Sequence, residues 1–144
     1  MVSELGLSLD EMFVLGSPRA RPPAAADRGG AAPVQRAVDR RAIELESGVR
    51  WERLTAWNDN DIEFMEAIYE VGGASSPDGK LVRHSGREFG LVLSGTLSVT
   101  VGFEEHVLQP GDSISFASTI PHRLHNEGAD PVHALWIELN RYAE

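Results

Sequence analysis

The sequence contains no cysteine. This absence excludes a disulfide framework, thiolate metal sites, iron–sulfur ligation and a cysteine nucleophile. Any metal that the chain binds must therefore be held by histidine and carboxylate side chains. The lack of cysteine is also compatible with a reducing cytosol.

The chain also lacks a long hydrophobic run and an excess of positive charge. Its least polar stretch, Phe89–Phe103, is interrupted by Ser, Thr and Gly, and its first residues show no basic stretch followed by an apolar one. We therefore expect a cytoplasmic protein without a signal peptide or a membrane span. The formal net charge of −9 argues against a broad DNA-binding surface, because Lys and Arg contacts to phosphate supply most non-specific affinity for DNA.

The composition divides the 144 residues into three segments, of which one is long enough for a modest domain. Residues 1–15 include Ser8-Leu9-Asp10-Glu11, which fits a capping box and predicts a short helical fragment. Residues 16–41 are rich in Pro, Ala and Gly, which predicts a flexible linker. Residues 42–144 are predicted to form the folded domain.

The folded domain reads as a series of short apolar runs separated by turn residues. The runs are Ile43–Leu45, Trp51–Leu54, Phe64–Val71, Phe89–Leu93, Leu97–Val101, Val107–Leu108, Ser113–Phe116 and His133–Leu139. In Leu97–Val101 apolar and polar residues alternate, as in a strand with one buried face. Turn sequences such as Pro77-Asp78-Gly79 and Pro110-Gly111-Asp112 lie between runs. This pattern predicts an all-β barrel or sandwich.

Four residues are candidates for a chemical site: His84, Glu88, His122 and His125. Imidazole and carboxylate side chains suit a first-row divalent metal such as Zn, Fe, Mn or Ni. His84 and Glu88 would share a face on an extended strand, but we expect Gly86 to make a turn between them. The spacing alone therefore does not bring the candidate ligands together.

The other candidates near these positions have ordinary structural interpretations. His125 is an odd number of residues from His122, so on a regular strand it lies on the opposite face and at the surface. Asn126 is expected to fix a turn. We expect His106 and His133 to be ordinary strand or turn residues. Arg83 and Arg87 flank the candidate site. They are either solvated surface charges or positive groups that attract an anionic ligand.

The stretches Ser76–Gly95 and Gly111–Asn126 resemble the two motifs of the cupin superfamily, G-x5-H-x-H-x3/4-E-x6-G and G-x5-P-x-G-x2-H-x3-N. His84, Glu88 and Gly95 match the first motif, with Ser76 in place of its opening Gly and Val82 in place of its first His. Gly111, His122 and Asn126 match the second, with Ala117 and Thr119 in place of its Pro and Gly. The resemblance implies an all-β double-stranded β-helix, or jelly-roll barrel.

The resemblance also implies a metal held in the mouth of the barrel by three remaining ligands, His84, Glu88 and His122. Because Val82 replaces the fourth ligand, two hypotheses stay open. In one, the three residues form a two-His, one-carboxylate metal site. In the other, they form a metal-free polar centre that binds a small ligand together with Val82 and Phe116.

The order of the segments resembles cytoplasmic transcriptional regulators in which an XRE-type helix-turn-helix precedes a cupin sensor domain. Residues 2–13 look like the last helices of that DNA-binding domain, and within these 144 residues the resemblance extends to no other part of a helix-turn-helix. The resemblance implies a small-molecule-sensing and dimerisation domain with no direct DNA binding of its own. We expect a small polar or anionic ligand and a homodimer, formed by sheet packing or by strand addition at residues 42–54. One alternative is a metal-dependent enzyme, either a dioxygenase or an isomerase, and another is a purely structural cupin dimer with an empty polar pocket.

Overall fold

The computed structural model describes residues 33–59 and 61–139. In this part of the chain nearly all regular structure is β-strand, and there is no helix long and apolar enough to cross a membrane. The elements are η3 (Ala37–Asp39), β1 (Ala42–Leu45), β2 (Val49–Arg53), β3 (Ile62–Tyr69), η4 (Pro77–Gly79), β4 (Arg87–Ser94), β5 (Leu97–Val101), β6 (Glu104–Leu108), β7 (Ser113–Ala117), β8 (His122–His125) and β9 (Val132–Leu139). The helical fragment predicted at residues 1–15, and most of the linker predicted at residues 16–41, lie outside the described residues.

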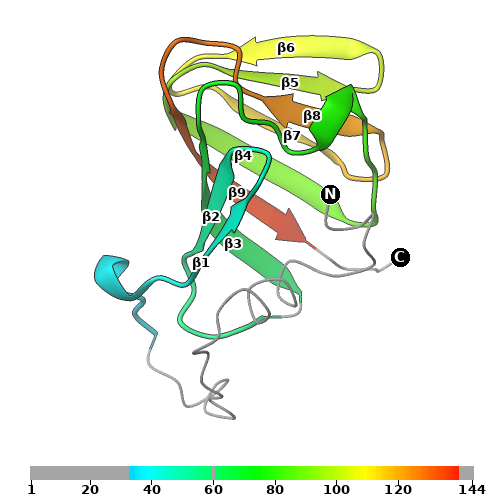
Figure 1. The fold of residues 1–144 in the computed structure, drawn as a ribbon. Helices are drawn as coiled ribbons and strands as arrows, with labels where there is room; N and C mark the ends of the chain where they lie inside the picture. Colours follow the sequence, from blue (N-terminus) through cyan, green and yellow to red (C-terminus); the bar gives the residue numbers. More distant parts are fainter. Residues whose placement is uncertain (1–32, 60, 140–144) are drawn as a thin grey trace.

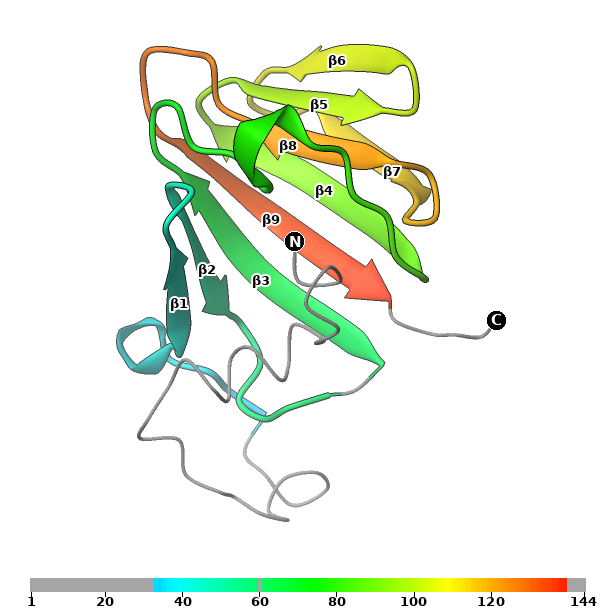
Figure 2. The same cartoon turned by 45° about the vertical axis from the view of Figure 1, so that its right-hand side comes forward.

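The strands form two antiparallel sheets that face each other. The larger sheet has the order β1-β2-β3-β9-β4-β7, and the smaller one has the order β6-β5-β8. Figures 1 and 2 show the smaller sheet lying across one end of the larger sheet, with β1 and β6 at their edges. The all-β expectation is therefore confirmed.

Period-2 alternation decides which face of the larger sheet is buried. In β9 every second residue from Val132 to Glu138 is buried, and β3 shows the same alternation. The buried side chains of both sheets form one core. The core contains Ile43, Val49, Trp51, Met65, Ala67, Tyr69, Val92, Leu97, Val99, Leu108, Phe116, Leu124, Val132, Ala134 and Trp136.

The structure adds strand residues that the apolar pattern does not indicate. β6 begins at Glu104, in a charged stretch whose first four residues are exposed. It pairs with β5 as an edge strand, so packing does not impose alternation on it. β8 spans His122–His125 and pairs with the central strand β5. Its polar composition hides the strand from hydrophobic patterning.

Asn126 fixes the turn after β8, in agreement with its expected role. It is almost fully buried, with an exposed fraction of 1%. Its Nδ2 donates hydrogen bonds to the backbone oxygens of Tyr69, Glu70 and Asp130, while its Oδ1 accepts one from the Gly128 amide. This one side chain therefore ties the β8–β9 connection to the end of β3.

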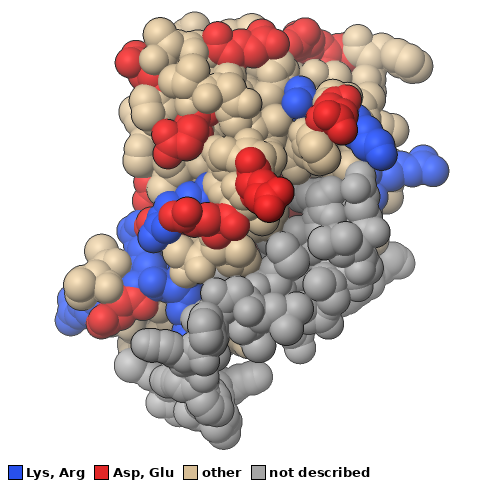
Figure 3. All heavy atoms as spheres, in the orientation of Figure 1, with Lys and Arg blue, Asp and Glu red and all other residues tan. Residues whose placement is uncertain are grey.

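The described end of the predicted linker is attached to the outer face of the larger sheet. Arg40 donates hydrogen bonds of 2.9 Å to both Glu52 and Glu66. Arg50 pairs with Glu52 and Glu44 on the same face. On the face shown in Figure 3, acidic and basic side chains of the described residues are intermixed beside β1 and β2 and form no broad basic surface.

Candidate functional site

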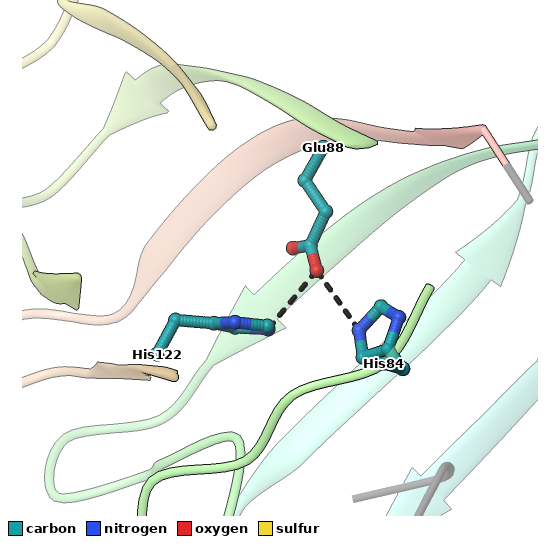
Figure 4. Close-up of side chains that lie close together, drawn as sticks. All are labelled: His84, Glu88 and His122. Carbon is teal, nitrogen blue, oxygen red and sulfur yellow. Dashed lines mark ion pairs between the residues drawn. The ribbon is translucent and has the colours of Figure 1, made fainter. Parts of the chain in front are cut away.

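Three of the predicted site residues meet inside the barrel although they come from separate segments. His84 lies between η4 and β4, Glu88 lies in β4 and His122 begins β8. Glu88 Oε2 is 3.0 Å from His84 Nε2 and 3.0 Å from His122 Nε2. Figure 4 shows both imidazoles pointing at this oxygen. We call His84, Glu88 and His122 the polar triad.

Backbone pairing brings the two histidines of the polar triad together. The amide and carbonyl of Val82 exchange hydrogen bonds of 3.0 and 2.9 Å with those of His122, and the His84 amide donates to the Ser118 carbonyl. The chain then turns at Gly86, which has a φ of 104°, before β4 begins. The two imidazole centroids consequently lie 5.2 Å apart in an edge-to-face arrangement.

The ring nitrogens that face away from Glu88 contact backbone carbonyls. His122 Nδ1 is 2.7 Å from the oxygen of Ile120, and His84 Nδ1 is 3.1 Å from the oxygen of Ser85. When Nδ1 donates its proton there, a neutral ring directs the lone pair of Nε2 at the carboxylate. Two states satisfy this geometry: an imidazolium that donates from both nitrogens, or a neutral imidazole whose Nε2 binds a cation shared with Glu88.

The second oxygen of Glu88 is held by an indole. Trp136 Nε1 donates a hydrogen bond of 2.9 Å to Glu88 Oε1. The Trp136 ring lies directly on Gly90, where an added Cβ would collide with it. Gly90 is therefore needed for the indole to cross β4 and reach Glu88.

Burial and hydrogen bonding act in opposite directions on the polar triad. Burial would raise the pKa of Glu88, but hydrogen bonds from His122 and His84 outweigh it and hold this pKa well below its usual range. Burial would lower the pKa of His122, but its hydrogen bond to Glu88 raises this pKa above the usual value. The arrangement therefore favours a carboxylate opposed by positive charge.

The donor atoms of the polar triad fit a divalent metal. Two imidazole nitrogens and one carboxylate oxygen lie within 4.8 Å of one another, and the contacts of Nδ1 with carbonyls orient the Nε2 lone pairs, as is usual for metal-binding histidine. Val82, which replaces the first His of the cupin motif, is buried, with an exposed fraction of 5%. Its aliphatic side chain donates nothing to a metal, so at most three protein ligands come from these positions.

A pocket lies next to the polar triad and contains about 360 Å³ of empty space, part of it continuous with solvent. Its walls are mainly apolar and aromatic, with a few polar groups, as is common in small-molecule sites. The lining residues are Trp51, Met65, Ala67, Tyr69, Ser75, Glu88, His122, Leu124, Trp136 and Glu138.

Two of the five predicted ligand-binding residues, Glu88 and His122, line this pocket. His84 contacts Glu88 from the side, and Phe116 packs with its ring centroid 5.0 Å from that of His122. Val82, His84 and Phe116 are not among the lining residues.

Sequence reasoning missed Trp51, Tyr69, Trp136 and Glu138 as lining residues. Period-2 alternation along β9 could have shown that Trp136 and Glu138 point inward together with Ala134. It could not have shown that they lie beside Glu88, because that depends on the pairing of β9 with β4.

The remaining histidines lie outside the polar triad. His125 has the expected opposite orientation, but its side chain is only 12% exposed because its ring lies between Glu105 and Glu127 at 3.5 and 3.2 Å. These three residues form a second histidine–carboxylate group, whose two carboxylates are exposed. His106 contacts Glu104, and His133 contacts Glu66 on the outer face.

Comparisons with known proteins agree with the fold. The chain is 29% identical over 72 residues to the HTH-type transcriptional regulator PuuR of Escherichia coli, which covers 50% of this chain and 39% of the regulator. This chain thus spans about two-fifths of the length of that curated relative.

Solved structures of low sequence identity share the same architecture. The Cupin_2 domain of an XRE family transcriptional regulator from Enterobacter cloacae has a TM-score of 0.56 at 23% identity, covering 64% of this chain and 96% of that one. A sugar phosphate isomerase of the cupin superfamily from Silicibacter pomeroyi has a TM-score of 0.55 at 23% identity, covering 64% and 59%.

The family model for the cupin domain, Cupin_2, matches residues 65–138. This match spans about half of the 144 residues, from the middle of β3 to the end of β9, and includes all of the polar triad. The expectation of a cupin fold is confirmed, and the chain belongs to the Cupin_2 domain family.

Proposed function

We propose that this chain is the small-molecule-sensing and dimerisation part of a transcriptional regulator, with its ligand bound in the barrel pocket. The observation that carries the proposal is the pocket itself, in which the buried Glu88 and His122 of the polar triad stand among aromatic walls. The likeness to a curated HTH-type regulator supports the regulatory context. In such a protein the ligand shifts an equilibrium between conformations or dimer arrangements.

The polar triad suits ligand recognition because its groups are already positioned. Glu88 accepts a hydrogen bond from Trp136 and lies 3.0 Å from the Nε2 atoms of His84 and His122, and its exposed fraction is only 2%. A ligand that enters the pocket therefore meets a fixed polar group and does not have to order it, which reduces the entropic cost of binding. Tyr69 also lines the pocket, and burial together with the charges of Glu88 and Glu138 raises the pKa of its hydroxyl, so this group keeps its proton as a hydrogen-bond donor.

We infer that dimerisation uses the outer face of the larger sheet. Phe89 and Leu93 of β4 are 36% and 45% exposed there, and Phe89 lies opposite Ile137 of β9 in the strand register. Ile62 of β3 adds a further exposed apolar side chain, at 41%. Packing two such faces together removes apolar surface from water.

A metal-dependent enzyme is the second candidate, because the polar triad has the composition of a two-His, one-carboxylate site. His84, Glu88 and His122 would hold the metal, and a divalent ion there supplies Lewis-acid or oxygen chemistry when bound. The structural likeness to the sugar phosphate isomerase from Silicibacter pomeroyi concerns the fold alone. Because Val82 cannot bind a metal, the site would have three protein ligands.

A screen of small polar metabolites by thermal shift tests the sensing proposal. Ala67→Leu adds apolar bulk to the pocket wall in the middle of β3, so it should abolish stabilisation by any true pocket ligand. Ala129→Leu, at an exposed position of the β8–β9 connection, is the matched control and should leave that stabilisation unchanged. Ligands that stabilise both variants equally bind elsewhere and contradict the proposal.

A further inference from the structure

Three glutamates lie side by side on the inner face of the larger sheet. Glu138 of β9 is directly opposite Glu63 of β3 and Glu88 of β4 in the strand register. All three are buried, with exposed fractions of 4% for Glu63, 9% for Glu138 and 2% for Glu88. Side chains directly opposite one another on neighbouring strands lie about 5 Å apart at Cβ. We call these three residues the glutamate row.

The members of the glutamate row differ in the interaction partners of their carboxylates. Glu88 contacts His84, His122 and the indole of Trp136. Glu63 also has an interaction partner. Glu138 makes no hydrogen bond or ion pair within the described part of the chain, although it is nine-tenths buried and lines the pocket. A buried carboxylate without a partner is costly, so such a group either holds a proton or faces a cation.

The electrostatic environment of Glu138 makes a cation favourable there. Its neighbours on both sides, Glu63 of β3 and Glu88 of β4, are also carboxylates, so Glu138 lies between two groups of the same chemistry. A positive group placed beside Glu138 would interact favourably with every carboxylate of the glutamate row. An anionic group at the same place would add a further like charge.

The walls of the pocket also suit a cation. Trp51, Tyr69 and Trp136 contribute aromatic rings to it, and aromatic faces attract ammonium and guanidinium groups. Among the described residues no Lys or Arg lines this pocket. The predicted flanking arginines, Arg83 and Arg87, are both exposed. A carboxylate or phosphate ligand would therefore meet positive charge only at the histidines.

We propose that the ligand of the barrel pocket is a small organic cation, an alkylammonium or a related amine, whose charged group lies against Glu138 and within the aromatic walls. This inference rests on the proposed sensing function and specifies its ligand class. It concerns Glu138, which is not part of the polar triad. The charged end would enter towards the glutamate row, while the apolar part of the ligand contacts Met65 and Leu124 on the pocket walls.

Matched probes that differ in charge test the ligand class. Short alkylammonium ions, the corresponding alcohols and the corresponding carboxylates are titrated by calorimetry into the full chain, with a chelator present so that metal ions do not contribute. We expect the ammonium ions to bind at least about tenfold more tightly than the alcohols. Glu138→Gln should remove this preference, whereas Glu46→Gln, at an exposed turn position, should keep it.

The results of these titrations separate the ligand class from the existence of the ligand site. Binding of alcohols or carboxylates in preference to ammonium ions overturns the cationic class but leaves the pocket as a ligand site. Binding of no probe of any charge also overturns the cationic class, and the sensing proposal fails separately only if the metabolite screen gives no ligand sensitive to Ala67→Leu. If Glu138→Gln does not fold, the comparison of the three probes on the unmodified chain still decides the charge preference.

Discussion

The indole of Trp136 donates its Nε1 proton to Glu88 Oε1 at 2.9 Å, so β9 and β4 are joined inside the pocket by a buried hydrogen bond to a charged acceptor. The carboxylate uses its other oxygen to face His84 and His122. An aromatic wall of the pocket and its polar triad are thus one hydrogen-bonded unit. A change that moves the indole should also disturb the histidines.

Gly90→Ala tests this coupling. The added methyl group would occupy the space of the Trp136 ring, so the indole must move and its hydrogen bond to Glu88 is lost. Overpacking of this kind costs about 1–3 kcal/mol of unfolding free energy. Urea unfolding measures the loss, and near-ultraviolet circular dichroism reports the displaced indole. Gly128→Ala is the control, because its added methyl group meets only ordinary contacts; equal effects of the two changes would contradict the coupling.

Glu138→Gln should stabilise the protein at neutral and alkaline pH when no ligand is bound. The pKa of Glu138 is raised in the folded state by burial and by the charges of Glu88 and Glu63. The folded state therefore binds the proton more tightly than the unfolded state, and stability falls as pH rises from the unfolded pKa towards the folded one. The variant lacks this loss, so it should gain on the order of 1 kcal/mol above that window and little below it.

Chemical unfolding across a pH series, with a chelator present, measures this difference. Glu46→Gln at an exposed position should follow the unmodified protein at every pH. A Glu138→Gln variant that is less stable than the unmodified protein at pH 8, and equally stable at pH 4, would show that the carboxylate has a favourable partner in the folded state.

The metal-dependent enzyme hypothesis predicts how much metal the purified protein retains. If the polar triad binds a divalent ion, protein incubated with Zn, Fe, Mn or Ni and then desalted should keep about one equivalent by elemental mass spectrometry. His84→Ala/His122→Ala should lose it, because two of three ligands are gone. His106→Ala/His133→Ala, which changes two histidines outside the triad, should retain it. Metal-free protein after incubation would contradict the enzyme hypothesis.

The proposed dimer face predicts that charge at its centre prevents association. Phe89→Glu/Leu93→Glu places two carboxylates among exposed apolar side chains of β4, so the variant should sediment as a monomer where the unmodified protein sediments as a dimer. Glu44→Lys on the edge strand β1 separates the two modes of association. If that change alone produces monomers, dimerisation uses strand addition at β1 and not the apolar face.

The strand pattern follows from local spacing and the triad residues from their resemblance to the cupin motifs, whereas the partners around them follow from neither. Alternation in Leu97–Val101 predicts β5 because one of its faces is buried in the core. His84, Glu88 and His122 are identified through motif spacing, and Gly86 makes the predicted turn between the first two. Their meeting depends on the pairing of Val82 with His122, which is fixed by tertiary structure.

The glutamate row is a clearer case of an arrangement that the sequence alone does not predict. Glu63, Glu88 and Glu138 lie far apart in the sequence, and each taken alone resembles an ordinary surface carboxylate near a strand end. A shift of one residue in the pairing of β9 would turn Glu138 to solvent. The register β3-β9-β4 is therefore what creates the charge cluster.

The most direct test of the pocket as a ligand site uses the indole N–H resonances of the protein. The sequence has three tryptophans, of which Trp51 and Trp136 line the pocket and Trp57 does not. In a 15N-labelled sample titrated with an alkylammonium ion, or with a compound that stabilises the protein in the metabolite screen, we expect the Trp51 and Trp136 indole signals to shift while that of Trp57 stays in place. A ligand that shifts Trp57 alone, or stabilises the protein without moving the Trp136 signal, would contradict binding in the barrel.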